Sequence, residues 1–122
     1  MGGRTAKIQM RRLGGVNLVS AAGELDLWKG RELSVALRKV VGEEEGPLVV
    51  DLTKAEGIGA TALAALLNAL RRLTRQRRRV SLIMAPGSLR ESFELAGMLK
   101  TFNVHPTLEA ALADLEHGAR RQ

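Results

Sequence analysis

The sequence predicts an α/β protein with a small, mixed, mostly parallel β-sheet and helices packed against it. Three observations support this fold class. Leu48-Val49-Val50 is a continuous apolar run, which is typical of a strand covered on both faces. The segment after it carries leucines at positions 63, 66, 67, 70 and 73, and this spacing predicts a helix with one apolar stripe. Strand-like and helix-like segments then alternate to the end of the chain.

The N-terminal part predicts a hairpin followed by a helix. Ala6 to Met10 alternates as a short edge strand, and Val16 to Ala22 alternates as a second strand antiparallel to it. The second strand ends at Gly23-Glu24-Leu25-Asp26. Leu27 to Val41 has apolar residues at helical spacing, and Gly42 is a natural stop.

The central stretch, Leu48 to Leu73, predicts a strand, a turn from Lys54 to Thr61 and a long helix. As a structural residue, Thr61 would cap this helix and satisfy one of its free amides, a contribution of ~1 kcal/mol. Asp51 is expected to end the strand and to accept hydrogen bonds from amides of the turn.

Two more strand–helix units follow. Val80 to Ala85 predicts a strand, and Ser88 with Glu91 fits a capping box that starts a helix ending at Gly97. A last strand is expected around Phe102 to Val104. A final helix then opens at Pro106-Thr107, has Gly118 past its end, and carries the buried stripe Leu108, Ala111, Leu112 and Leu115.

The predicted order is therefore ββαβαβαβα, in one domain over residues 1–122 with a core of about residues 8–115. Strand–helix–strand crossovers are nearly always right-handed, so the carboxyl ends of the second, third and fourth strands face one edge of the sheet. Ligands and partners bind at that edge in open α/β sheets. It gathers Gly23 to Trp28, Thr53 to Thr61 and Ala85 to Ser88, and we expect the functional site there.

Composition limits the chemistry. The absence of cysteine excludes a disulfide or a thiolate metal site, and two histidines argue against a protein metal site. The N-terminus lacks an apolar signal region, and no apolar run approaches the ~20 residues of a membrane span. We therefore expect a cytoplasmic protein that does not insert into a membrane.

The net charge of +6 comes from one basic cluster of six arginines with no acid among them. A solvated helix end is the first interpretation of this cluster, and an anionic docking patch is the alternative. Aromatic residues, which usually accompany basic ones in nucleic-acid binders, number only three, so we expect no direct nucleic-acid binding. The cluster comprises Arg71, Arg72, Arg75, Arg77, Arg78 and Arg79.

Gly57 to Ala62 fits the dinucleotide pattern G-x-G-x-x-A. The first glycine should follow the strand directly, however, and here Asp51 to Glu56 intervene; the acidic residue expected ~20 positions later is also missing. We therefore predict no cofactor. We also predict no enzyme, because His105 is expected away from the convergent edge and no nucleophile, base and orienting group meet there.

Three motifs occur in the order and spacing of a known family: Gly23-Glu24-Leu25-Asp26 before a helix, Val49-Val50-Asp51-Leu52 before a glycine- and hydroxyl-containing turn, and Phe93-Glu94-Leu95-Ala96-Gly97-Met98. Together they resemble the STAS domain of bacterial anti-sigma factor antagonists, over about Ile8 to Leu115. The resemblance implies a partner-switching protein that binds an anti-sigma factor/serine-threonine kinase when unphosphorylated and thereby frees a sigma factor. Such proteins let go when a serine or threonine of the turn is phosphorylated.

The turn of this family usually has the sequence Asp-Ser-Ser-Gly, and its second hydroxyl is the phosphoacceptor. Those positions fall on Gly59, Ala60, Thr61 and Ala62 of this chain. The resemblance therefore implies Thr61 as the phosphoacceptor candidate. It implies a partner-binding surface around it, with the candidates Glu24, Asp26, Gly57, Gly59, Ala60 and Ala62. Asp26 has an equally good structural interpretation as the N-cap of the first helix.

A STAS-type accessory subunit of a membrane transporter is the alternative function. There the same edge would dock on an ATP-binding subunit, and Thr61 would be a contact without phosphorylation. The oligomeric state stays open at this point.

Overall fold

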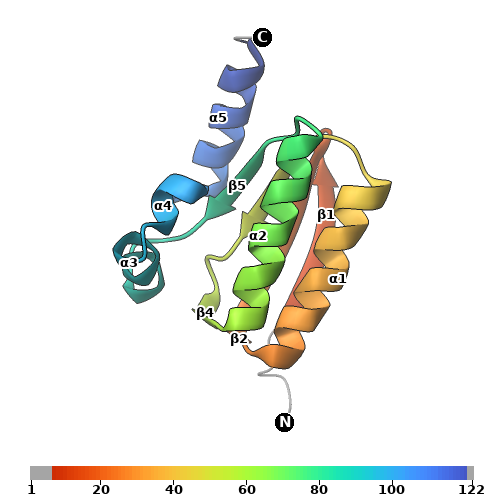
Figure 1. Cartoon of the computed structure of the whole chain (residues 1–122). Helices are drawn as coiled ribbons and strands as arrows, with labels where there is room; N and C mark the ends of the chain where they lie inside the picture. Colours follow the sequence, from red (N-terminus) through yellow and green to blue (C-terminus); the bar gives the residue numbers. More distant parts are fainter. Residues whose placement is uncertain (1–6, 121–122) are drawn as a thin grey trace.

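The computed structural model describes residues 7–120, with side chains through residue 116. It contains one sheet with helices on both of its faces (Figure 1). The elements are, in order, β1 Lys7–Leu13, β2 Val16–Leu25, α1 Leu27–Glu43, β3 Leu48–Asp51, β4 Ala55–Ile58, α2 Ala60–Arg75, β5 Val80–Ile83, α3 Ser88–Leu95, α4 Met98–Thr101, β6 Asn103–His105 and α5 Leu108–Arg120.

The strand order in the sheet is β1-β2-β3-β5-β6, and β4 pairs with β2 beyond the end of β3. β1 and β2 form the antiparallel hairpin, and every other pairing is parallel. The predicted fold class, a mixed and mostly parallel sheet with helices, is confirmed. In the part of the chain that the structure describes, no helix is both long enough and apolar enough to cross a membrane.

The two faces of the sheet are covered unequally. α1 and α2 lie side by side on one face (Figure 1), where Leu48 and Val50 of β3 join the main core. α5 covers part of the other face, where Val49 packs with Ala111 and Leu115. Side chains alternate along a strand, so β3 needs apolar residues at every one of these positions. The continuous apolar run at the centre of the sequence follows from this double coverage.

Two short elements were not predicted. β4 lies in the segment interpreted as a turn, and α4 lies in the expected connection after Gly97. β4 contains only Ala55-Glu56-Gly57-Ile58, which has neither an apolar run nor β-branched residues at alternate positions. It forms because β2 continues to Leu25 and offers it a free edge.

Several predicted boundaries were wrong. β1 continues to Leu13, because its partner β2 offers backbone groups along that whole length; Ala6, where we expected it to begin, lies outside the described residues. α1 continues through Gly42 to Glu43, and α5 continues through Gly118 to Arg120. A glycine inside a helix costs only ~1 kcal/mol, which is too little to stop a helix at its end.

Three helix caps can be compared with their predictions. Oδ1 of Asp26 accepts a hydrogen bond from the Lys29 amide at 3.0 Å, which confirms it as the N-cap of α1. The other two cap predictions were wrong, because α2 and α3 each begin one residue after a glycine, Gly59 and Gly87, and neither has a side-chain cap. Thr61 and Ser88 lie inside the first turns of their helices instead.

One arginine of the basic cluster ties the two main helices together at their C-terminal ends. The Arg78 guanidinium donates to the backbone carbonyls of Val40 at 3.2 Å, Val41 at 3.2 Å and Gly46 at 2.8 Å. These carbonyls end α1 and the loop after it, and some of them would otherwise lack a partner. Arg78 is therefore a structural residue, whereas the sequence interpretation treated all six arginines alike.

Candidate functional site

The predicted edge forms where β2 and β4 end together. Glu24 lies opposite Gly57 and Leu25 opposite Ile58 in the parallel pairing. The Gly59 amide then donates to the carbonyl oxygen of Leu25 at 2.9 Å. These backbone contacts fix the start of α2 against the start of α1, so two segments far apart in the sequence share one surface.

The first turns of α1 and α2 touch through Gly30, which is buried. A Cβ at Gly30 would lie 2.7 Å from the Ala62 amide nitrogen and 2.9 Å from the Cβ of Thr61. Only glycine permits this approach, because a real Cβ does not come so close to backbone. We had not singled out Gly30 from the sequence, although a glycine within a predicted helix is itself a signal of close packing.

Thr61 lies half-buried at the second position of α2. Its Cβ and Cγ2 face the backbone of Gly30. Among the described residues, its hydroxyl makes no hydrogen bond. The helix behind it has neither an acidic residue in its first turn nor a side-chain cap. A hydroxyl at this place is therefore flanked by free helix amides and by the positive end of the helix dipole.

The predicted partner-binding residues differ in how far they are exposed to solvent. Ala60 is exposed, and Gly57 and Gly59 are half-buried. The exposed carboxylate of Glu24 lies over Gly57, in the space that a Cβ at that position would occupy. Asp26 is exposed beside Gly59 while it caps α1. Ala62 is fully buried in the core, so it supports the turn from beneath and does not belong to the accessible surface.

The third predicted segment reaches the same edge through α3. A hollow of about 300 Å³ separates α3 from β4 and the start of α2. Its wall is mainly apolar, and Ser88 is one of its polar lining residues. The apolar lining residues include Ile58, Leu63, Leu89, Phe93 and Met98.

Comparison with known proteins agrees with this geometry. Residues 7–111 match the STAS domain family. The chain belongs to the STAS domain family. Over 104 residues it is 31% identical to the anti-sigma-F factor antagonist RsfB of Mycobacterium tuberculosis, which covers 85% of this chain and 84% of RsfB.

Solved structures show the same STAS fold. A crystal structure of an anti-sigma factor antagonist from Mycobacterium paratuberculosis superposes with a TM-score of 0.83 at 28% identity, covering 92% of this chain and 95% of that one. A sulfate transporter family protein from Wolinella succinogenes superposes with a TM-score of 0.68 at 17% identity, covering 85% and 87%. The second likeness concerns the fold alone.

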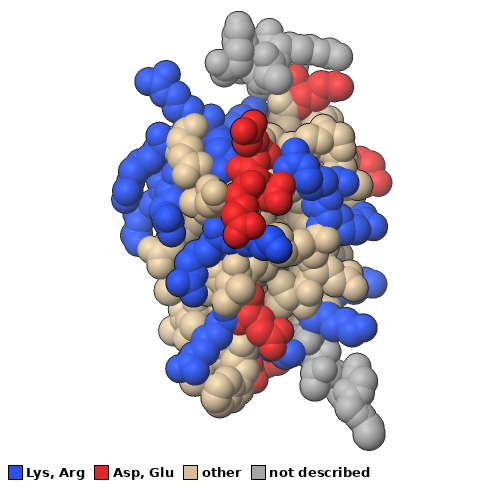
Figure 2. Space-filling model, turned by 90° about the vertical axis from the view of Figure 1, so that its right-hand side faces the viewer, with Lys and Arg blue, Asp and Glu red and all other residues tan. Residues whose placement is uncertain are grey.

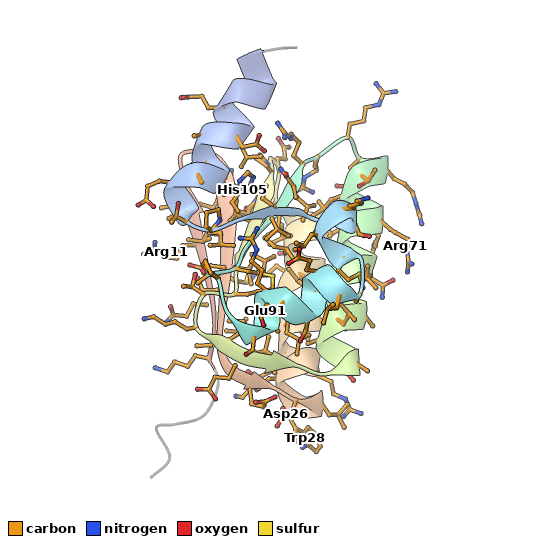
Figure 3. All side chains as sticks on the ribbon, turned by 90° about the vertical axis from the view of Figure 1, so that its left-hand side faces the viewer. Arg11, Asp26, Trp28, Arg71, Glu91 and His105 are labelled. Atoms are coloured by element: carbon orange, nitrogen blue, oxygen red, sulfur yellow. The ribbon has the colours of Figure 1, made fainter. Side chains whose placement is uncertain are left out.

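Polar groups elsewhere in this STAS domain have structural partners. Asp51 accepts hydrogen bonds from the amide of Thr53 at 2.9 Å and from its hydroxyl, as expected for a strand-end residue. Nε2 of His105 lies 3.3 Å from Oδ2 of Asp114 on α5. Figure 3 shows His105 well away from the end of the molecule that carries Asp26. Asp51 therefore has a structural role in its own turn, and the His105–Asp114 pair lies away from the end that carries Asp26.

Proposed function

We propose that this STAS protein is an anti-sigma factor antagonist. It binds an anti-sigma factor/serine-threonine kinase in the cytoplasm, frees the corresponding sigma factor, and is released by phosphorylation of Thr61. It acts by binding and not by catalysis. The observation that carries the proposal is the position of Thr61 at the start of α2, packed against Gly30 of α1, with a hydroxyl that makes no hydrogen bond to the described residues. Identity of 31% with RsfB supports the choice of partner class.

Phosphorylation at this position would act on the partner more than on the fold. A phosphate adds about −1.5 to −2 charge at neutral pH. The amides and the dipole at the start of α2 favour an anion there, so the domain keeps its structure. A partner packed against the turn would have to desolvate or repel the dianion, and the complex would dissociate faster.

The turn of this chain lacks the aspartate of the usual family turn, and the packing around Gly59 offers a physical reason. Gly59 replaces the aspartate, and a Cβ there would lie 3.2 Å from the carbonyl oxygen of Leu25, a tight contact. The carboxylates beside the turn come from Glu24 and Asp26 instead. We propose that these two residues, with Gly57, Gly59 and Ala60, form the surface that the partner touches.

Binding to purified anti-sigma factors tests this function. Each anti-sigma factor encoded in the same genome is titrated by calorimetry with wild-type protein and with Thr61→Ser, Thr61→Ala and Thr61→Glu. We expect one of them to bind wild type, Thr61→Ser and Thr61→Ala similarly, and Thr61→Glu at least tenfold more weakly. If none binds the wild-type protein, or if Thr61→Glu binds as tightly, the proposed switch is wrong.

The transporter alternative has no comparable support in this chain. The likeness to the sulfate transporter family protein lies at 17% identity and concerns the fold. Co-purification with a permease-associated ATPase, and with no anti-sigma factor, would reverse the preference.

A further inference from the structure

One face of α1 carries two large apolar side chains that are exposed to solvent. Trp28 is 65% exposed and Val35 is 62% exposed. Large aromatic side chains are usually well buried, and this is the only tryptophan of the chain. Trp28, Arg31, Val35 and Arg38 follow one another at helical spacing, so they form a single stripe along the helix. We call these four residues the α1 stripe.

The two arginines of the α1 stripe have no acidic partner within ion-pair distance among the described residues. The Arg31 guanidinium lies over the Trp28 ring, with Cζ 5.2 Å from its centroid. Among the described residues, Arg31 and Arg38 make no ion pair, whereas their neighbour Lys29 is paired with Glu32. Figure 2 shows Lys and Arg along both flanks of this side of the molecule, and Asp and Glu in separate groups near its middle.

The α1 stripe leads into a groove between α1 and α2. This groove has a volume of about 390 Å³ and is flanked by Arg38 from one helix and Arg72 from the other. Its wall includes buried apolar groups, Leu37 and Ala65 among them. Arg72 also makes no ion pair among the described residues. The groove is therefore mostly polar at its surface and lies between two cations that make no ion pair among the described residues.

The α1 stripe also begins at the candidate switch. Trp28 and Gly30 both lie in the first turn of α1; the backbone of Gly30 touches Thr61, and Trp28 lies on a different side of the helix. Figure 3 shows Asp26 and Trp28 together at one end of the molecule. A partner seated on the Thr61 turn would therefore reach the α1 stripe by extending around the N-terminal end of α1.

We propose that the α1 stripe and the adjoining groove dock an acidic, amphipathic segment of the anti-sigma factor, an inference that rests on the function proposed above. Apolar side chains of that segment cover Trp28 and Val35, and its carboxylates pair with Arg31, Arg38 and Arg72. A tryptophan that becomes buried beside an arginine on binding is typical of an interface hot spot. A second copy of this chain is a poor occupant, because a two-fold contact would place arginines against arginines.

The single tryptophan gives a direct reporter of this contact. Protein labelled with 5-fluorotryptophan has one fluorine resonance, because Trp28 is the only site. Unlabelled anti-sigma factor, identified by the calorimetry above, is then added. We expect that resonance to shift or broaden in proportion to the bound fraction. We also expect Trp28→Ala to weaken binding by tenfold or more while the thermal transition of the free protein stays unchanged.

Charge reversal tests the acidic character of the segment. Arg38→Glu should weaken binding at least tenfold at low salt, and the loss should shrink as salt is added. Arg11→Glu is the matched control: it makes the same charge change on β1, and Figure 3 places Arg11 on the side of the molecule away from α2. It should leave the affinity within about twofold.

The outcomes separate this inference from the proposed function. If Thr61→Glu abolishes binding while the fluorine resonance does not move, the docking surface is wrong and the function stands. If no anti-sigma factor binds the wild-type protein, both are overturned. A dimer in sedimentation velocity that Trp28→Ala dissociates would assign the α1 stripe to a second copy and would also overturn the inference.

Discussion

Gly30 of α1 lies directly against Thr61 of α2: a Cβ on Gly30 would lie 2.9 Å from the Cβ and 3.0 Å from the Cγ2 of Thr61. The same Cβ would also press on the backbone nitrogen of Ala62, which no rotamer change can relieve. The position of the candidate acceptor hydroxyl therefore depends on the absence of a side chain in a different helix.

Replacing Gly30 should loosen the contact between the two helices. We expect Gly30→Ala to lower the free energy of unfolding by about 1–3 kcal/mol, the usual cost of overpacking a tight contact. Urea unfolding measures it. Gly42→Ala is the control in the same helix, because nothing lies within 4 Å of a Cβ there. It should raise the free energy of unfolding by about 0.5–1 kcal/mol. Equal effects of the two substitutions would contradict the close approach.

Arg78 should be the arginine on which stability depends. Arg78→Met keeps the apolar stem and removes the three bonds to the carbonyls of Val40, Val41 and Gly46. We expect a loss of about 1–3 kcal/mol in the free energy of unfolding, because the bonds are charge-assisted. Arg75→Gln, at an exposed position of the same cluster, should change it by less than about 0.5 kcal/mol. If Arg78→Met leaves the free energy of unfolding unchanged, water must satisfy these carbonyls as well as the guanidinium does.

Asp114 should make the attachment of α5 depend on pH. Its pKa is lowered from the usual 3.8, first by the hydrogen bond from Asn103 and then by Arg79 and His105. A lowered folded-state pKa contributes stability above the unfolded-state value and loses it as the pH falls through the folded-state value. Asp114→Asn should therefore cost stability at pH 5, by about 1 kcal/mol or less because the side chain is partly exposed.

That cost should diminish as the pH falls from 5 toward 3, below the unfolded-state pKa, because the wild-type protein then loses the contribution of the ionised carboxylate. Chemical unfolding of both proteins at the two pH values measures it. Glu109→Gln on the exposed side of α5 is the control and should show no such difference. A gap between wild type and Asp114→Asn that grows on acidification would contradict the sign of the pKa shift.

The sequence predicted the fold well because the long elements have strong, regular patterns. The β3 run and the leucines of α2 required a covered strand and an amphipathic helix, and the crossover rule then set the parallel order. β4 was not predicted because its pairing depends on how far β2 extends, which is a long-range property. The N-caps of α2 and α3 are Gly59 and Gly87, which lie two residues and one residue before the predicted caps. Backbone packing, and not a side-chain cap, sets these helix starts.

The candidate site was only partly predictable for the same reason. The position of Thr61 near the convergent edge followed from topology and from the family turn. The role of Gly30 required knowing how closely α1 and α2 approach, and the burial of Ala62 required knowing which side of α2 faces the core. Arg78 could not be singled out because it lies in a run of similar residues. Its carbonyl partners lie more than thirty positions away in the sequence.

Mass spectrometry of the protein incubated with its anti-sigma kinase and ATP tests the central claim most directly. We predict a gain of one phosphate, mapped to Thr61, together with loss of binding to that kinase; Thr61→Ala should gain none and stay bound. No phosphate on wild-type protein, together with full binding of the kinase by both Thr61→Ala and Thr61→Glu, would contradict the switch.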